Sequence, residues 1–182
     1  KKHLMNELFE KKNLPFYKFG DAIYLAKIET KYWIEYICKR FENTGKHISP
    51  ELAEEICRLV DNHSSYVQQL SWLLWIRTIN TATTEQLSYA LEDLLDQNNI
   101  LFQSETENLS AYQMNFLKAI VDGIHTKFSS KEVISKYNLG TSANIVRLKN
   151  ALLQKELIET NGKEIVLEDP VFGVWFKKEM LY

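Results

Sequence analysis

The sequence predicts a mainly helical fold with one short β-hairpin near its C-terminal end. Through most of residues 30–155, apolar residues recur every three or four positions, which is the spacing of one face of an α-helix. Later, Asn161-Gly162 separates the β-prone runs 157–160 and 164–167, and this pair is the strongest short signal for a hairpin. The composition is that of a folded protein, since 45% of the 182 residues are hydrophobic and 25% are charged.

The first 29 residues are expected to form a segment that leads into the helical part. Residues 1–11 place Leu4 and Leu8 on one face of a short helix, and Pro15 prevents this helix from continuing. Residues 16–25 are rich in aromatic side chains, so we expect an extended arm or a short strand there.

Three helices are expected next. The first spans residues 30–44 and ends at Gly45, a residue that commonly terminates helices. The second begins at Ser49-Pro50-Glu51, where Ser suits the N-cap, Pro the first turn and Glu the positive end of the helix dipole. The third spans about 66–79. It is apolar nearly all round, so we expect a central bundle helix with Trp72 and Trp75 in the core.

A fourth helix is expected to begin after Thr83, because Thr83 followed by Gln86 is a capping-box sequence. Its apolar stripe starts at Leu87 and continues weakly to Phe102. We expect this helix to join two domains. The predicted organisation is therefore a leading segment (1–29), a helical bundle (30–107) and a C-terminal domain (108–182).

The C-terminal domain has a recognisable order of elements. Helices are expected at 110–121, after a capping box at 129–132, and at 141–155 following a tight turn. The hairpin comes next, and Asp169-Pro170 caps a last helix. Helix, helix, turn, helix and two-stranded ribbon is the order of a winged helix-turn-helix.

The whole order resembles the C-terminal half of prokaryotic P-loop ATPases of the AAA+ and STAND type, related to the archaeal origin-recognition ATPases. In that family a helical lid and a winged helix follow the nucleotide-binding core. Each matching stretch is only weakly specific, and their order carries the resemblance. These stretches are residues 1–5, 15–20 with 23–25, 41–49, 61–68 and 168–176.

The resemblance implies a nucleotide-lid turn at Asn62, His63 and Ser64. Asn62 and Ser64 stand where the family commonly has Gly and Pro. Because Asn tolerates the left-handed backbone conformation, we expect the turn to persist without the proline contact. The family's ATP and Mg²⁺ are held by an upstream core whose G-x-x-x-x-G-K-[ST] motif does not occur here. These residues alone are therefore expected to have no cofactor and no ATPase activity.

No catalytic or metal-binding constellation is visible in the sequence. The four histidines are scattered, and Cys38 and Cys57 are expected to be small hydrophobic residues of a reduced protein. Paired carboxylates such as Glu54-Glu55 are expected on solvated helix faces. Residues 1–9 do not resemble a signal peptide, and the longest apolar run, 72–76, is too short to cross a bilayer. We therefore expect a cytoplasmic protein with no membrane partner.

The predicted recognition helix presents groups that suit DNA. Ser142 and Asn144 at its start could meet base edges, and Arg147 and Lys149 could meet phosphates. Lys131 and Lys163, with Lys136, could add backbone contacts. The basic charge is weak, however, since residues 108–182 hold ten Lys or Arg against eight Asp or Glu, and Glu156, Glu159 and Glu164 lie near the wing. DNA and protein therefore both remain candidate partners.

The leading hypothesis is a C-terminal fragment of a P-loop ATPase, whose lid covers the nucleotide of its own upstream core and whose winged helix docks onto DNA or protein. A free-standing winged-helix DNA-binding regulator is one alternative, and it predicts duplex affinity that falls steeply with salt. A protein–protein adaptor is another, and it predicts an exposed apolar patch. An independent enzyme is disfavoured because no nucleophile or acid–base pair appears.

Overall fold

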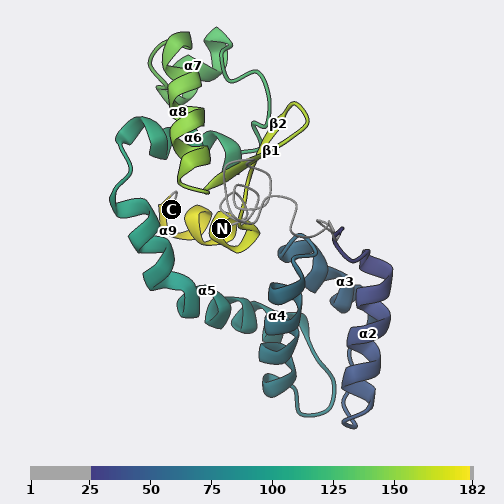
Figure 1. The fold of residues 1–182 in the computed structure, drawn as a ribbon. Helices are drawn as coiled ribbons and strands as arrows, with labels where there is room; N and C mark the ends of the chain where they lie inside the picture. The colour runs from purple at the N-terminus through teal and green to yellow at the C-terminus, as the bar shows by residue number, and fades with distance from the viewer. Residues whose placement is uncertain (1–25, 181–182) are drawn as a thin grey trace, which may run out of the picture.

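The computed structural model describes residues 26–180 and has the predicted mainly helical fold (Figure 1). The expected helix over 1–11 and most of the aromatic segment after it lie outside the described residues. The elements, in chain order, are α2 (Thr30–Glu42), α3 (Pro50–Leu59), α4 (Ser64–Arg77), α5 (Thr84–Glu107), α6 (Ala111–Val121), α7 (Lys131–Tyr137), α8 (Ser142–Gln154), β1 (Ile158–Asn161), β2 (Glu164–Leu167) and α9 (Pro170–Met180).

The predicted start of α3 is confirmed. The Ser49 hydroxyl accepts a hydrogen bond from the Leu52 amide at 3.2 Å, Pro50 is the first helical residue, and Gly45 has a positive φ of 73° after α2. The loops before α3 and α5 are joined, because the His47 amide donates to the Asn80 carbonyl and the Ala82 amide donates to the His47 carbonyl.

The bundle core is built from the apolar faces of α2, α3, α4 and the first half of α5. Its buried members include Trp33, Ile37, Phe41, Ile56, Val60, Leu70, Leu74, Leu87 and Leu94.

The helix α4 packs between α3 and α5, as predicted for a central helix, but the prediction that Trp72 lies in the core is wrong. The helix begins at Ser64 and ends at Arg77, and it buries Val67, Leu70 and Leu74 against α3 and α5. Trp72 and Ile76 lie on its other side with 56% and 51% of their surfaces exposed, and Trp75 is half-buried. An apolar helix is buried all round only if neighbours surround it, and no described element covers this side.

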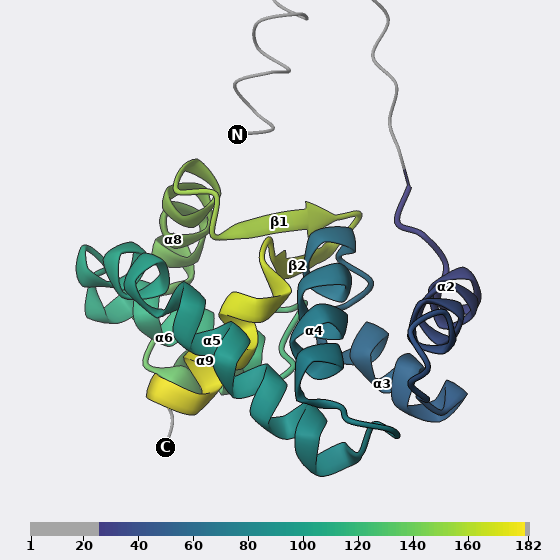
Figure 2. The same ribbon diagram turned by 90° about the horizontal axis from the view of Figure 1, so that it is seen from below.

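The helix α5 connects the bundle to the C-terminal elements, as expected. Thr83 and Gln86 form the predicted capping box. The first half of α5 packs against α4 and its second half packs against α9, which Figures 1 and 2 both show beside it. Phe102 is fully buried there, in contact with Phe172 and Trp175. Two α5 side chains on the other face, Ile100 and Leu101, are exposed.

The winged helix consists of α6, α7, α8, the hairpin and α9. The predicted capping box at 129–132 is wrong by one position, because Ser130 is the N-cap of α7 and accepts from the Val133 amide. With Ser130 as N-cap, the third helical residue is a valine, which cannot reach back to complete the box. The tight turn before α8 is confirmed, since Asn138 has left-handed φ of 50° and Gly140 has φ of 83°.

The hairpin is present, but its turn differs from the expected Asn-Gly turn. Asn161 is the last residue of β1 and pairs with Glu164, so Gly162 and Lys163 form the two-residue turn. Of these two residues only Gly162 has a positive φ, 61°, and glycine at the first turn position is typical of type II′. The strands bury Ile158 and Ile165 against the domain core, which fixes their register.

Candidate functional site

The predicted lid turn at 61–64 connects α3 to α4. Asp61 and Asn62 both have left-handed backbone conformations, with φ of 47° and 53°, so the expectation for Asn62 is confirmed. The side-chain NH₂ group of Asn62 donates to the Thr30 hydroxyl at 3.0 Å, and this hydroxyl lies 3.2 Å from the side-chain oxygen Oδ1 of Asn62. The turn is therefore tied to the first residue of α2, and its shape is set by the fold.

His63 is the residue just before α4, but its side chain does not cap that helix. Its ring packs on the ring of Tyr66, with centroids 4.7 Å apart and planes at 41°. The Nδ1 atom of His63 is shielded from solvent and has no hydrogen-bond partner among the described residues. Ser64 is exposed and is the first helical residue, a position that proline would also suit.

Carboxylates surround the other side of this turn. A cavity of about 410 Å³ lies there, and its lining includes Glu51, Glu54, Glu55 and Asp61. Two of these charges are partly neutralised. Lys27 donates to Asp61 at 2.6 Å, and Arg58 donates to Glu55, which lowers the pKa of the Glu55 carboxyl. Glu54 is exposed, as expected for a solvated helix face, whereas Glu55 is half-buried.

Tyr66 connects the lid turn to the winged helix. Its hydroxyl donates a hydrogen bond of 2.6 Å to Oδ2 of Asp169, a residue 103 positions later in the chain. The other oxygen of Asp169 accepts from the amides of Val171 and Phe172 and so caps α9, as predicted. Burial and the bond to Asp169 raise the pKa of the Tyr66 hydroxyl, so it stays protonated. One carboxylate therefore caps α9 and binds α4.

Glu105 on α5 adds a second negative charge near Asp169. Loss of water around its carboxyl, and then repulsion by Asp169, raise the pKa of Glu105, although the residue as a whole is exposed. A raised folded-state pKa means that ionised Glu105 destabilises the folded protein once the pH exceeds that pKa. At a pH below the pKa of Glu105 in the unfolded chain, this carboxyl is neutral in both the folded and the unfolded protein. The destabilisation is then absent.

Glu105→Gln is therefore expected to raise the melting temperature at pH 7, and the gain should shrink as the pH falls through the acidic range. Thermal unfolding followed by circular dichroism at several pH values measures this. Glu107→Gln, at the exposed end of the same helix, is the matched control for net charge. Equal shifts for the two variants would show that the proximity of Glu105 to Asp169 has no effect on stability.

The candidate DNA-contact residues do not form one cluster. Ser142 and Arg147 are exposed on α8, and Lys149 is half-buried. The side-chain amide of Asn144 donates to the Leu139 carbonyl at 3.0 Å, so it holds the turn before α8 together. Lys131 begins α7 and Lys163 lies in the hairpin turn, and Figure 1 shows these two elements well apart.

No other chemistry is apparent in the described part of the chain. Residues 26–180 contain no group of three or more metal-ligating side chains placed to hold an ion. Burial raises the pKa of the Cys57 thiol to about 11 and also raises that of the half-buried Cys38, so both are unreactive thiols. None of the helices formed by these residues is both long and apolar enough to span a bilayer.

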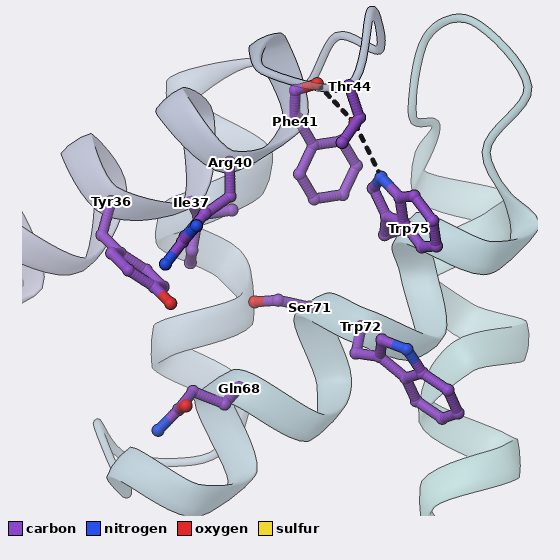
Figure 3. Close-up of a pocket in the computed structure, with 9 residues that line it drawn as sticks. All are labelled: Tyr36, Ile37, Arg40, Phe41, Thr44, Gln68, Ser71, Trp72 and Trp75. Atoms are coloured by element: carbon purple, nitrogen blue, oxygen red, sulfur yellow. Dashed lines mark hydrogen bonds between the residues drawn. The ribbon is translucent and has the colours of Figure 1, made fainter.

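Sequence reasoning missed two features. The Tyr66–Asp169 bond joins residues too far apart for any local pattern to reveal, although Asp169 itself was identified as a cap. The second feature is a groove between α2 and α4, lined by residues that include Tyr36, Arg40 and Trp72 (Figure 3). The sequence did contain a signal for this groove, because α4 carries more apolar side chains than two neighbouring helices can cover.

Comparisons with known proteins agree with this architecture. A family model described as "probable winged helix domain" matches residues 100–178. The structure is similar to that of the Walker-type ATPase of Pyrococcus abyssi, with a TM-score of 0.68 and 17% sequence identity, over 97% of this chain and 49% of that one. No curated protein sequence matches the chain. The chain thus spans about half the length of that ATPase and shares the fold of the part it covers, ending in a winged helix domain.

Proposed function

We propose that this chain is the lid and winged-helix part of a P-loop ATPase. An upstream core of the same polypeptide would hold ATP and Mg²⁺, and residues 30–107 would cover the nucleotide. The winged helix would dock onto a macromolecular partner, and the chain from Lys1 to Tyr182 would not hydrolyse ATP by itself. The likeness to a Walker-type ATPase over nearly the whole chain supports this proposal.

The likeness to the Walker-type ATPase carries the assignment, and the Tyr66–Asp169 hydrogen bond supports a coupling between the lid turn and the winged helix. His63 in the lid turn contacts the Tyr66 ring, and the Tyr66 hydroxyl binds the residue that caps α9. A movement of the lid turn would therefore change the packing of Tyr66 and the bond to Asp169. This gives a short physical route from a nucleotide site to the winged helix.

Regulation by this route requires two arrangements of lid and winged helix that differ in their affinity for nucleotide. One arrangement is the described one, with the Tyr66–Asp169 bond formed. The other would break this bond and leave α9 without its link to α4. Nucleotide binding would then favour one arrangement, and partner binding would be coupled to it in both directions.

The test begins with the coding sequence upstream of Lys1. An in-frame region with G-x-x-x-x-G-K-[ST] after a strand is expected, and the protein expressed from its own start codon should bind ATP. Hydrogen exchange of the α9 amides should then differ with and without a non-hydrolysable ATP analogue. Tyr66→Phe should abolish this difference, and because the coupling is reciprocal it should also change ATP affinity.

Two outcomes would contradict the proposal. A start codon directly before Lys1, with no ATP affinity in the expressed protein, would leave only a small regulator or adaptor. Exchange at α9 that is the same with and without the analogue would exclude the route through Tyr66. In the second case, ATP binding alone would still support the ATPase assignment.

The partner of the winged helix can be distinguished by electrostatics. Residues 131–164 hold six Lys or Arg and four Glu, a modest positive excess that supports duplex DNA. Val146, at 61% exposure beside Arg147 on α8, instead supports an apolar protein contact.

If DNA is the partner, affinity for a duplex should fall with salt, and Arg147→Gln should lower the slope of log affinity against log salt by about one. Fluorescence anisotropy at several salt concentrations measures this, with Lys118→Gln on α6 as a charge-matched control. An anisotropy that does not change at low salt would favour a protein partner.

A further inference from the structure

The helices α2 and α4 form the two walls of a groove on the outer side of the bundle. Both helices begin near the lid turn, where Thr30 is bonded to Asn62. Their far ends are also joined, because the Trp75 indole donates to the Thr44 hydroxyl at 2.8 Å and Lys46 donates to the Trp75 carbonyl at 2.7 Å. Contacts at both ends fix the distance between α2 and α4, so the groove is formed in the absence of any ligand.

The space between these ends is large enough for a small molecule. It encloses about 450 Å³, within the range of common ligand pockets. The lining is mainly apolar and aromatic. It consists of Tyr36, Ile37, Arg40, Phe41 and Thr44 from the α2 side and Gln68, Ser71, Trp72 and Trp75 from α4 (Figure 3).

Two polar groups in the groove have no polar partner among the described residues. The Ser71 hydroxyl is shielded from solvent and makes no hydrogen bond, and Figure 3 shows it pointing from α4 toward α2. Arg40 is the one charged residue in the lining, and it forms no ion pair within residues 26–180. Its guanidinium lies over the Tyr36 ring, 5.1 Å from the centroid, on the wall that faces Ser71.

An occupant that satisfies this groove must have two parts. An apolar, flat body would contact the aromatic side chains, since aromatic rings pack well on one another. An anionic group would pair with the Arg40 guanidinium, which binds planar carboxylates in a two-pronged geometry. A neutral ligand would gain no attraction from the exposed Arg40 guanidinium, so charge complementarity favours an acid.

We propose that the α2–α4 groove is a binding site for a small aromatic carboxylate. The aromatic ring lies against the apolar lining between α2 and α4, and the carboxylate points to Arg40. The inference does not depend on an ATPase core, because every residue of the site belongs to the described chain. The two helices that form the groove, α2 and α4, also lie well away from α8 in Figure 1.

Indole-3-acetate and indole-3-acetamide are a matched pair of probes, because they differ mainly in the charge of one group. Titration of ¹⁵N-labelled protein, followed by NMR of the tryptophan indole N–H groups, should shift Trp72 and Trp75 but not the buried Trp175. The acetate should bind roughly two- to fivefold more tightly than the acetamide, the usual effect of a solvent-exposed ion pair. Arg40→Gln should remove this preference.

The control variant is Arg147→Gln, which removes a similar exposed charge far from the groove and should leave both affinities unchanged. Three results would overturn the proposal. These are no shift of Trp72 or Trp75 by saturating acetate, equal affinity for acetate and acetamide, and a preference for acetate that survives Arg40→Gln. The second result would identify an apolar docking surface, and the third would place the anion elsewhere. Arg40 is exposed, so its replacement should not disturb folding.

Discussion

Replacing Trp175 by alanine is expected to lower the free energy of unfolding by about 3–5 kcal/mol, the usual cost of deleting a large buried aromatic side chain. Trp175 is 1% exposed and packs against Phe102 and Phe172, with centroid distances of 5.6 Å and 5.8 Å. Its indole N–H also donates to the Asn99 side chain at 2.8 Å, which ties α9 to α5. The change therefore removes both a core side chain and the partner of Asn99.

Urea denaturation followed by far-ultraviolet circular dichroism measures this loss, because the signal does not depend on tryptophan. Trp72→Ala is a matched control on another helix. Trp72 is 56% exposed, so its replacement should change the free energy of unfolding by roughly 0.5 kcal/mol or less. Similar losses for the two variants would mean that Trp72 is covered in the folded protein and that its exposed position is wrong.

Asp169→Ala is expected to cost about 2–4 kcal/mol. Loss of an N-cap typically costs about 0.5–2 kcal/mol, and here two amides, those of Val171 and Phe172, lose their acceptor. In addition, the largely buried Tyr66 hydroxyl loses its acceptor, which typically costs about 1–3 kcal/mol. The two effects act on separate oxygens of one carboxylate, so both are lost together.

Two further variants separate these contributions. Asp169→Asn keeps a capping oxygen and a polar group opposite Tyr66, so its loss should stay below about 1 kcal/mol. Tyr66→Phe removes the hydroxyl alone and should cost about 1 kcal/mol, the typical net value of one hydrogen bond. Denaturation of the singles and of the Tyr66→Phe, Asp169→Ala double variant gives the coupling energy. A coupling energy near zero would show that the bond across the domains contributes nothing to stability.

Local patterns in the sequence predicted most helices because each one combines an apolar stripe with a terminal signal. Ser49 before α3, Thr83 before α5 and Asp169 before α9 are examples in which a short polar side chain, followed by suitable residues, defines the start. The error at Ser129-Ser130 has the same origin, because two adjacent serines offer two possible caps. The choice depended on the packing of the helix, which the local sequence does not contain.

The candidate sites were less predictable for a physical reason. Asn62 could be assigned a left-handed conformation because this depends on the residue type alone. The partners of Tyr66 and Asn144 depend on which elements lie opposite each other. Asn144 suited base contact by its position on α8, yet the carbonyl of Leu139 is within its reach and occupies it. Trp72 was assigned to the core by composition, and the absence of a covering element on that side exposes it.

The continuity of α5 limits how the two ends of the molecule can move. Its 24 residues contain neither proline nor glycine, so it should behave as one rigid rod of about 36 Å. A tilt of about 5° at one end would displace the other end by about 3 Å, for a rod of this length. The Tyr66–Asp169 bond joins α4 to the start of α9, and these two helices pack on opposite ends of α5. At 2.6 Å it would break under such a displacement, so the rod can swing only after Tyr66 releases Asp169.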